Sequence, residues 1–243
     1  MSIIAGDNLT KNTLSIFVPC FNEEKNITTA LNNIREAIEN INYEILVVND
    51  GSTDKTGDMA EKFKKDNPNL NIKIFHNEKN VGLGSMYYLT AFKASGKYYM
   101  LINGDGDYPS EIKKVVKYLG KADMILPNFI DRRSLIRKII SRLFVIIVNL
   151  ITFNNLKYYN GPTLHLLDNV KLHKASTFHF SYQAELIANL INMKKTYVEV
   201  QVESIDTGGM AKVITPYNIL SLGKSIITIF LNQITYLTKK LFK

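Results

Sequence analysis

The chain has 243 residues, 46% of them hydrophobic and 21% charged, which is the composition of a globular protein with one sizeable core. Its single cysteine, Cys20, excludes a disulfide framework within the chain and favours a reduced, cytoplasmic setting. The formal net charge of +8 favours an anionic partner, such as nucleic acid, nucleotide phosphates or an acidic membrane surface.

The N-terminal part of the chain alternates between strand and helix patterns. Residues 14–19 (LSIFVP) form an apolar run typical of a buried strand. Asn22 is then a candidate N-cap for a helix whose apolar residues recur at helical spacing as far as Ile38. Residues 43–48 (YEILVV) predict the next strand, and a turn beginning at Asn49 follows it. This order predicts a right-handed parallel unit.

The same alternation continues through the first half. A helix around residues 59–63 ends at Asn67-Pro68, and residues 80–84 open another helix. Residues 72–75, 98–102 and 122–126 predict three further strands. The first half is therefore predicted to be an α/β fold with a Rossmann-like, mostly parallel central sheet and flanking helices.

An acidic loop follows the strand predicted over residues 98–102. It reads Asn103-Gly104-Asp105-Gly106-Asp107 and leads into a helical pattern that starts at Pro109. Its two carboxylates lie at the carboxyl end of a strand, where open α/β sheets bind ligands. Their i, i+2 spacing lets both face one hard cation. By itself the loop also fits a solvated turn; an EF-hand is excluded because its sixth position is Tyr108 and its twelfth is Lys114.

The second half is less regular. A long helical pattern over residues 132–153 is basic at its start and apolar afterwards, and a turn at 158–162 precedes a weak strand. A helix over 181–193 contains Glu185, and residues 196–202 alternate as a strand. We expect one domain over residues 1–213, followed by a basic amphipathic helical tail over 214–243 that has no acidic residue.

Two apolar stripes predict a surface contact. Basic amphipathic helices lie on anionic lipid surfaces, but the same stripes would also suit packing on the protein core or on a second copy. The stripe in the long helix comprises Ile136, Ile139, Ile140, Leu143, Phe144 and Ile147. The stripe near the C-terminus comprises Ile219, Leu222, Ile226, Ile229, Phe230 and Ile234. The longest strongly apolar run, residues 143–153, is too short for a membrane span, and residues 1–13 do not resemble a signal peptide.

Four motifs in this order resemble one family. They are VPCFNE at 18–23, VVNDGSTDKT at 47–56, NVGLGSMYYLTA at 80–91 and the acidic loop at 103–111. Together they are similar to the family 2 glycosyltransferases of the GT-A fold, in the branch of dolichyl- or polyprenyl-phosphate sugar synthases. The resemblance covers roughly residues 14–213.

The resemblance implies a nucleotide-sugar site. The nucleotide-binding residues that it implies are Pro19, Phe21, Asn22, Glu23, Asp50, Gly82, Asn103 and Gly104. Asp50, the second acid of the family's D-D-G-S motif, would bind the base, whereas the first acid of that motif is Asn49 here. The first acid of the family's D-x-D is Asn103 here. We therefore expect Asp105 and Asp107 to act together in catalysis and to hold the divalent cation, Mg²⁺ or Mn²⁺.

The resemblance also implies an acceptor-phosphate site. Arg137 and Ser141 match the R-x-x-x-S motif of this branch, and residues four apart share one helix face. The arginine usual after the fifth strand is missing, and Arg132 or Arg133 could replace it. Lys212 lies in a G-G-x-S-K-like loop in which Ala211 replaces the serine. The identity of the acceptor stays open.

The expected reaction is inverting sugar transfer from a nucleoside diphosphate to a polyprenyl phosphate, on the cytoplasmic, inner face of a membrane, in cell-envelope glycan synthesis. A phosphate acceptor needs no general base. The alternative acceptor is a sugar hydroxyl of a glycan, for which Glu185 is the candidate catalytic base. A non-catalytic nucleotide-binding protein is an alternative of another class. A nucleic-acid partner is not expected, since no binding motif accompanies the charge, and a homo-oligomer stays open.

Overall fold

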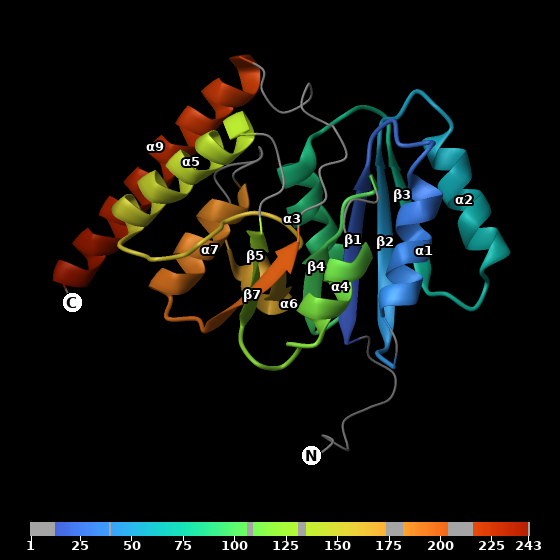
Figure 1. Ribbon diagram of the computed structural model, residues 1–243, viewed down its shortest axis with the longest axis horizontal. Helices are drawn as coiled ribbons and strands as arrows, with labels where there is room; N and C mark the ends of the chain where they lie inside the picture. The colour runs from blue at the N-terminus through green and yellow to red at the C-terminus, as the bar shows by residue number, and fades with distance from the viewer. Residues whose placement is uncertain are drawn as a thin grey trace.

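The computed structural model describes residues 13–38, 40–105, 109–130, 135–173, 182–203 and 216–242. They form one sheet with helices on both faces, so the predicted α/β class is confirmed (Figure 1). The strands are β1 (Leu14–Cys20), β2 (Tyr43–Asp50), β3 (Ile72–Asn77), β4 (Tyr98–Leu101), β5 (Met124–Ile130), β6 (Leu164–Leu166) and β7 (Tyr197–Glu203). The helices are α1 (Ile27–Ala37), α2 (Thr56–Asp66), α3 (Leu83–Lys93), α4 (Pro109–Val116), α5 (Leu135–Thr152), α6 (Leu167–Leu172), α7 (Tyr182–Asn192) and α9 (Pro216–Leu241).

The sheet is mostly parallel. Its strand order is β3-β2-β1-β4-β6-β5-β7, and β1 pairs in parallel with both β2 and β4. The short strand β6, expected as a weak strand after the turn at 158–162, runs antiparallel to β4 and β5. Beyond it, β5 and β7 are again parallel. The carboxyl ends of β1, β2 and β4 therefore meet at one edge of the sheet.

Two apolar cores lie on opposite faces of the sheet. One contains the buried side chains of α1 and α4, such as Ile34 and Val115, together with one face of the central strands. The other contains α3, α5, α6, α7 and Ile229 of α9. A stack of aromatic rings anchors this second core, with Tyr87 lying 4.9 Å from Tyr99 and 4.8 Å from Tyr182 between ring centroids.

Several element boundaries differ from the prediction because long-range partners decide them. Asn22 does not cap α1, which begins at Ile27; Asn22 has a φ of 56° and lies in a turn. Strand β2 continues to Asp50 because its last residues pair with β3. Strand β5 likewise extends to residue 130 alongside β7, and α6, which no pattern predicted, follows β6 directly.

A buried carboxylate anchors the edge of the sheet opposite to those carboxyl ends. Glu44, near the start of β2, is fully buried. Its carboxylate accepts hydrogen bonds from the Ser15 hydroxyl at 2.6 Å, the Ser95 amide at 2.6 Å and Lys73 Nζ at 2.8 Å. Burial raises the pKa of Glu44, but these hydrogen bonds outweigh it and hold the pKa below its usual value. Glu44 therefore ties β1, β3 and the turn after α3 to β2.

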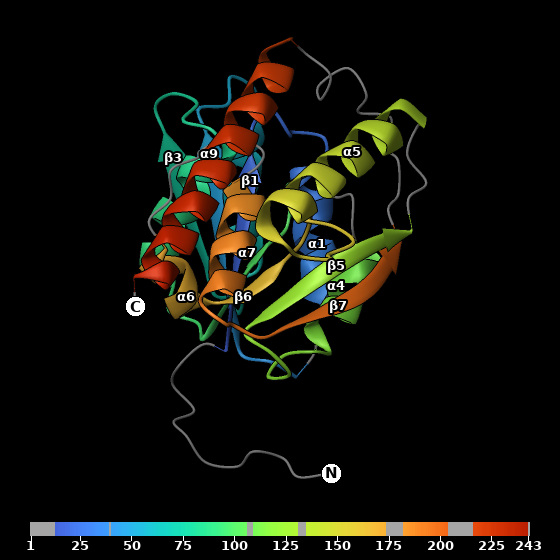
Figure 2. The ribbon, with the colours of Figure 1, turned by 90° about the vertical axis from the view of Figure 1, so that its left-hand side faces the viewer.

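Helices α5 and α9 lie together at the end of the molecule opposite to α2 (Figure 1). In Figure 2 both face the viewer, with α7 between them. The expected domain boundary at 213/214 lies outside the described residues, but Ile229 of α9 is part of the core beneath the sheet. Within the described ranges, no helix is both long and apolar enough to cross a bilayer.

Candidate active site

The acidic loop after β4 lies directly against the end of β1. Gly104 N–H donates to the Pro19 carbonyl at 3.0 Å. A Cβ at Gly104 would lie 2.9 Å from that oxygen and 3.0 Å from the Cys20 Cβ, so only glycine permits this close approach. The contact places Asn103 and Asp105, both half-buried, at the edge of the sheet beside the loop that follows β1.

Side chains tie the loop after β1 to the loop after β2. Asn22 Oδ1 accepts a hydrogen bond from Thr53 N–H at 2.9 Å, and Asn22 N–H donates to Ser52 Oγ at 3.0 Å. Glu23 N–H donates to Thr56 Oγ1 at 2.7 Å. The left-handed backbone of Asn22, which asparagine tolerates better than most residues, makes this geometry accessible. Two loops 30 residues apart in sequence thus form one rigid rim.

Asp50 holds a third segment at the same rim. Its side chain is buried, and Oδ1 accepts hydrogen bonds from Asn77 Nδ2 at 2.8 Å and Val81 N–H at 2.9 Å. Oδ2 accepts one from Gly82 N–H at 3.0 Å. Gly82 has a φ of 86°, which favours glycine, and directly precedes α3. Asp50 therefore shapes the loop that leads into α3.

Phe21 and Cys20 lie between these loops. The Phe21 ring is 44% exposed next to the polar groups of the rim. Cys20 is buried, and burial, together with the negative charges of Glu23, Asp54 and Asp50, raises the pKa of its thiol to about 12. Cys20 is therefore a packing residue, whereas Phe21 and Val81 give the rim exposed apolar side chains.

The acidic loop has the donor set of a hard divalent cation. Asp105 supplies a carboxylate and Asn103 an amide oxygen, whereas Asp107 lies outside the described residues. Mg²⁺ is usually held by one or two carboxylates and completed by water and substrate phosphates. Within the described part of the chain, no cluster of three His, Cys, Asp or Glu side chains could hold a metal by itself. The residues present fit a cation that is bound together with an anionic ligand.

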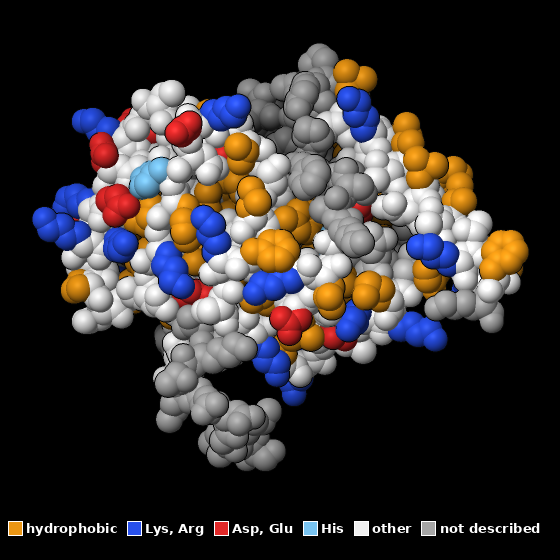
Figure 3. Space-filling view, turned by 180° about the vertical axis from the view of Figure 1, so that it is seen from behind, with side chains coloured by type: hydrophobic (Ala, Val, Ile, Leu, Met, Phe, Trp, Pro, Cys, Tyr) orange, Lys and Arg blue, Asp and Glu red, His pale blue; other side chains and the backbone are white. Residues whose placement is uncertain are grey.

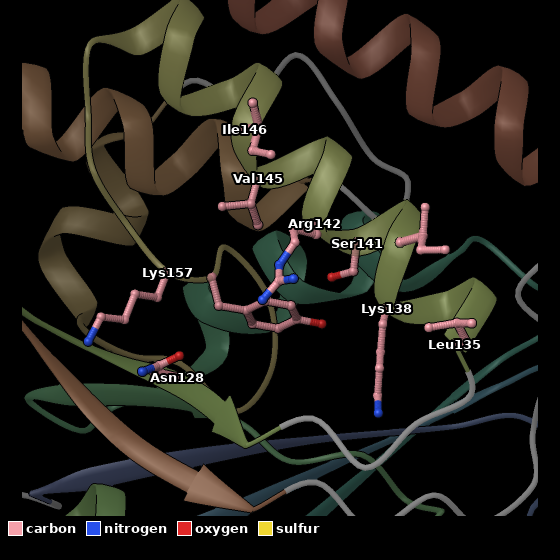
Figure 4. A pocket seen from close by; sticks show the side chains of 10 residues that line it. Asn128, Leu135, Lys138, Ser141, Arg142, Val145, Ile146 and Lys157 are labelled. Atoms are coloured by element: carbon pink, nitrogen blue, oxygen red, sulfur yellow. The ribbon is translucent and has the colours of Figure 1, made fainter.

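A basic cavity lies beneath α5. It has a volume of about 670 Å³ and combines cationic, polar and aliphatic side chains. Its lining residues are Asn128, Leu135, Lys138, Ile139, Ser141, Arg142, Val145, Ile146, Lys157 and Tyr158. Figure 4 shows Lys138 and Arg142 extending from α5 towards the strands, with Lys157 near Asn128. Among the described residues that line it there is no carboxylate, so this lining is suited to an anion that carries an aliphatic group.

Only some of the predicted acceptor-phosphate residues lie in the described part of the chain. Ser141 lines the cavity, and Arg137 lies one turn earlier in α5, although its side chain lies outside the described part. Arg132, Arg133 and Lys212 lie outside the described residues.

Three cations of the cavity, Lys138, Arg142 and Lys157, were not among the predicted site residues. Lys138 and Arg142 have the same i, i+4 spacing as Arg137 and Ser141, so a closer reading of the helix could have included them. Lys157 follows α5 on a separate loop and reaches the cavity only through the tertiary fold.

Glu185 occupies a different environment. It is 1% exposed at the start of α7, and its Oε1 accepts a hydrogen bond from Asn232 Nδ2 of α9 at 3.1 Å. The same oxygen lies 3.9 Å from His173 Nε2. Burial of the His173 ring lowers the pKa of this histidine. This carboxylate therefore takes part in the packing of α9 against α7.

Comparisons with known proteins identify relatives of the chain. Residues 15–184 match the family model described as Glycosyl transferase family 2. A dolichol-phosphate mannosyltransferase of Pyrococcus furiosus is 30% identical over 99 residues, covering 41% of this chain and 27% of the relative. A dolichyl-phosphate beta-glucosyltransferase of Dictyostelium discoideum is 24% identical over 182 residues, covering 64% of this chain and 54% of the relative. The matched part of this chain thus spans about a quarter to a half of these curated relatives.

Solved structures match a larger share of the chain. Glucosyl-3-phosphoglycerate synthase from Mycobacterium tuberculosis, in complex with Mn²⁺, uridine diphosphate and glucosyl-3-phosphoglycerate, superposes with a TM-score of 0.69. The match covers 91% of this chain and 80% of the synthase at 15% sequence identity. At this identity the likeness shows the fold, and the predicted GT-A architecture is confirmed.

Proposed function

Because the chain belongs to glycosyl transferase family 2, we propose that it transfers a sugar, with inversion, from a nucleoside-diphosphate sugar to a polyprenyl phosphate. The observation that carries the choice of acceptor is the cavity beneath α5, where three cations stand beside aliphatic side chains. Such a lining suits a phosphate joined to an aliphatic chain. The cavity borders β5, which is two strands, or about 10 Å, from β4 and its acidic loop.

The donor occupies the rim formed by the three loops. Phe21 offers an exposed ring to the nucleoside, and Asn22 and Glu23 are held in place by the loop after β2. Asp50 keeps the loop that leads into α3 in position, and with that loop it borders the base. The remaining proposed contacts come from Pro19, Gly82, Asn103 and Gly104.

The acidic loop receives the diphosphate. Asp105, together with Asp107, would hold a Mg²⁺ or Mn²⁺ ion, which when bound neutralises charge on the leaving diphosphate. Support comes from the oxygen donors of the loop and from the fold shared with a synthase whose structure contains Mn²⁺ and uridine diphosphate.

The acceptor phosphate acts as the nucleophile. One of its oxygens forms a bond to the anomeric carbon while the bond from that carbon to the diphosphate oxygen breaks, so no general base is required. Arg137 and Ser141, with Arg132, Arg133 and Lys212, are proposed to position this phosphate. Since polyprenyl phosphates reside in a bilayer, the reaction would take place at the cytoplasmic surface of a membrane.

A sugar hydroxyl is the second candidate acceptor, and it would require a base such as Glu185. The buried position of Glu185 and its hydrogen bond to Asn232 favour a structural role over proton abstraction. A nucleotide-binding protein without catalysis is the remaining alternative, and measured transfer would exclude it.

The test is a transfer assay over a panel of nucleotide sugars. Purified protein is incubated with each donor, a short-chain prenyl phosphate and Mg²⁺ or Mn²⁺, and the glycolipid is quantified by mass spectrometry. We expect transfer from one donor class, loss of transfer in Asp105→Asn, and a raised KM for the prenyl phosphate in Arg142→Ala. Lys64→Gln, an exposed change on α2, is the control. Transfer only to sugar hydroxyls, or an unaltered acceptor KM in Arg142→Ala, would contradict the proposal.

A further inference from the structure

The face of α9 that packs on the protein combines apolar side chains with buried polar ones. Gln233 is buried, and its Oε1 accepts a hydrogen bond from Asn192 Nδ2 of α7 at 2.8 Å. Asn232 donates to Glu185 of the same helix α7. Two more polar side chains of α9 are buried, Ser221 and Ser225. The hydrogen bonds of Gln233 and Asn232 form a polar seam that attaches α9 to α7, with Ile229 buried beside it.

The opposite face of α9 is also apolar, and it is exposed, whereas a surface helix usually turns its polar face to solvent. Exposed aliphatic and aromatic side chains follow one stripe, and the exposed fraction reaches 82% at Leu241. The stripe comprises Ile227, Phe230, Leu231, Ile234, Leu237 and Leu241. Figure 3 shows hydrophobic side chains along the right-hand side of the molecule, which is the side where α9 lies.

The sequence predicted a different stripe for this helix. Of its members, Leu222 and Ile226 pack against the core and Ile229 is buried, whereas Phe230 and Ile234 are exposed. The side chain of Ile219 lies outside the described part of the chain. The helix is thus apolar on two sides, and the tertiary structure buries only one of them.

Helix α5 extends the exposed apolar surface. It packs against α9, and both helices face the same side of the molecule (Figure 2). Its exposed apolar side chains include Leu135, Ile136, Ile139, Leu143, Ile147 and Leu150. We call the exposed apolar side chains of the two helices the α5–α9 surface. Exposed apolar areas of this kind mark interaction sites in soluble proteins.

The charges on the two helices select the partner. The sequences of α5 and α9 contain six cationic residues and no Asp or Glu. These residues are Arg137, Lys138, Arg142, Lys224, Lys239 and Lys240. A second copy of the chain would bring like charges together, whereas an anionic lipid surface attracts both the cations and the apolar stripe.

We propose that the α5–α9 surface docks on an anionic lipid bilayer, with its apolar side chains inserted at the boundary between headgroups and acyl chains. The polar seam with α7 fixes this surface relative to the sheet. The inference rests on the proposed function, because a lipid-linked acceptor is what brings the active site to a bilayer. Leu135, Ile139 and Ile146 belong both to exposed α5 and to the basic cavity, so the cavity lies beside the docked face.

The test measures vesicle binding by co-sedimentation. Vesicles of phosphatidylcholine alone are compared with equimolar phosphatidylcholine and phosphatidylglycerol. We expect the wild type to bind the anionic vesicles, and the double variant Phe230→Glu/Leu231→Glu to lose at least about tenfold in partition constant. Lys239→Gln/Lys240→Gln should lose about fivefold per lysine on anionic vesicles only. If circular dichroism shows that Phe230→Glu/Leu231→Glu does not fold, the result for Lys239→Gln/Lys240→Gln decides the test.

Two matched controls lie away from the surface. Lys64→Gln/Lys65→Gln removes two exposed lysines from α2, at the opposite end of the molecule, and Tyr118→Glu adds a charge after α4. Both should bind vesicles as the wild type does. Unchanged vesicle binding in the Phe230/Leu231 and Lys239/Lys240 variants would overturn the proposal. A dimer in size-exclusion chromatography that the glutamate variant dissociates, without vesicle binding by the wild type, would also overturn it.

Transfer to a water-soluble, short-chain prenyl phosphate separates this inference from the proposed function. The glutamate variant should keep that activity while losing vesicle binding, since Phe230 and Leu231 do not line the cavity. If the wild type binds anionic vesicles but transfers no sugar to any prenyl phosphate, the proposed function fails and the docking surface stands. If transfer to the soluble acceptor occurs without vesicle binding, the docking inference fails and the function stands.

Discussion

Replacing Asp50 with asparagine tests whether a single carboxylate organises the donor rim. The substitution keeps the size of the side chain and leaves one oxygen, which can still accept from Asn77 and Val81. In the wild type, Oδ2 accepts a hydrogen bond from Gly82 N–H at 3.0 Å. In the variant, an NH₂ group replaces this oxygen and faces the same N–H. Two donors then oppose each other at the start of α3.

The magnitude follows from this one lost contact. A hydrogen bond to a charged group contributes about 1.5–3 kcal/mol, and a buried donor left without a partner costs a similar amount. If the two retained hydrogen bonds persist, the free energy of unfolding should fall by about 1.5–3 kcal/mol. For a chain of this size, each kcal/mol lowers Tm by roughly 2–4 °C. We therefore expect a Tm lower by roughly 3–12 °C, together with weaker nucleotide binding.

Differential scanning calorimetry, followed by calorimetric titration with uridine and guanosine diphosphates in Mg²⁺, measures both effects. The control is Asp66→Asn, the same chemical change at an exposed position of α2, where Asp66 pairs with Lys62 at 2.9 Å. An exposed pair contributes little, so its Tm should stay within about 2 °C of the wild type. Equal Tm values for the wild type and Asp50→Asn would refute the reasoning that Asp50 holds the loop.

Two further predictions concern other parts of the fold. The folded-state pKa of Glu44 lies below its unfolded value, so its stabilisation is present above the unfolded pKa and is lost as pH falls through the folded pKa. Glu44→Gln should therefore lower the free energy of unfolding at neutral pH. In urea unfolding measured as a function of pH, the variant should lose less stability than the wild type as the pH falls; equal losses in both proteins would contradict this. In Gly104→Ala, the added Cβ should push the acidic loop away from Pro19. We expect kcat to fall at least tenfold with little change in the circular dichroism spectrum. Full activity would show that the close approach is not required.

The order of elements was predictable because it depends on local patterns. Apolar runs such as residues 14–19 and 43–48 became β1 and β2, and helical patterns located α1 and α5. Element ends were less predictable where distant residues decide them. Asn22 looks like an N-cap in isolation, yet its side chain bonds to Thr53, 31 residues away, and α1 begins at Ile27. Helix α6 carries no local signal strong enough to predict it.

The rim proposed to bind the donor was easier to predict from the sequence than the basic cavity proposed to bind the acceptor. Pro19, Asp50 and Asp105 each end or follow a parallel strand, so motif order alone placed them at one edge. The cations of the cavity come from a helix and a separate loop. Nothing local to Lys157 relates it to Arg142, and only the packing of α5 over β5 brings both to one cavity.

By itself, the sequence determined the fold class, the family and the edge of the sheet at which the candidate site lies, because strand and helix periodicity and motif order are properties of neighbouring residues. Only the tertiary structure decided which face of α9 is exposed, what Glu185 bonds to and which cations share a cavity. A helix that is apolar on two sides has no preferred orientation until its partners are in place. The hydrogen bonds that Asn232 donates to Glu185 and that Gln233 accepts from Asn192 determine which side packs on α7, and they join residues more than 40 positions apart.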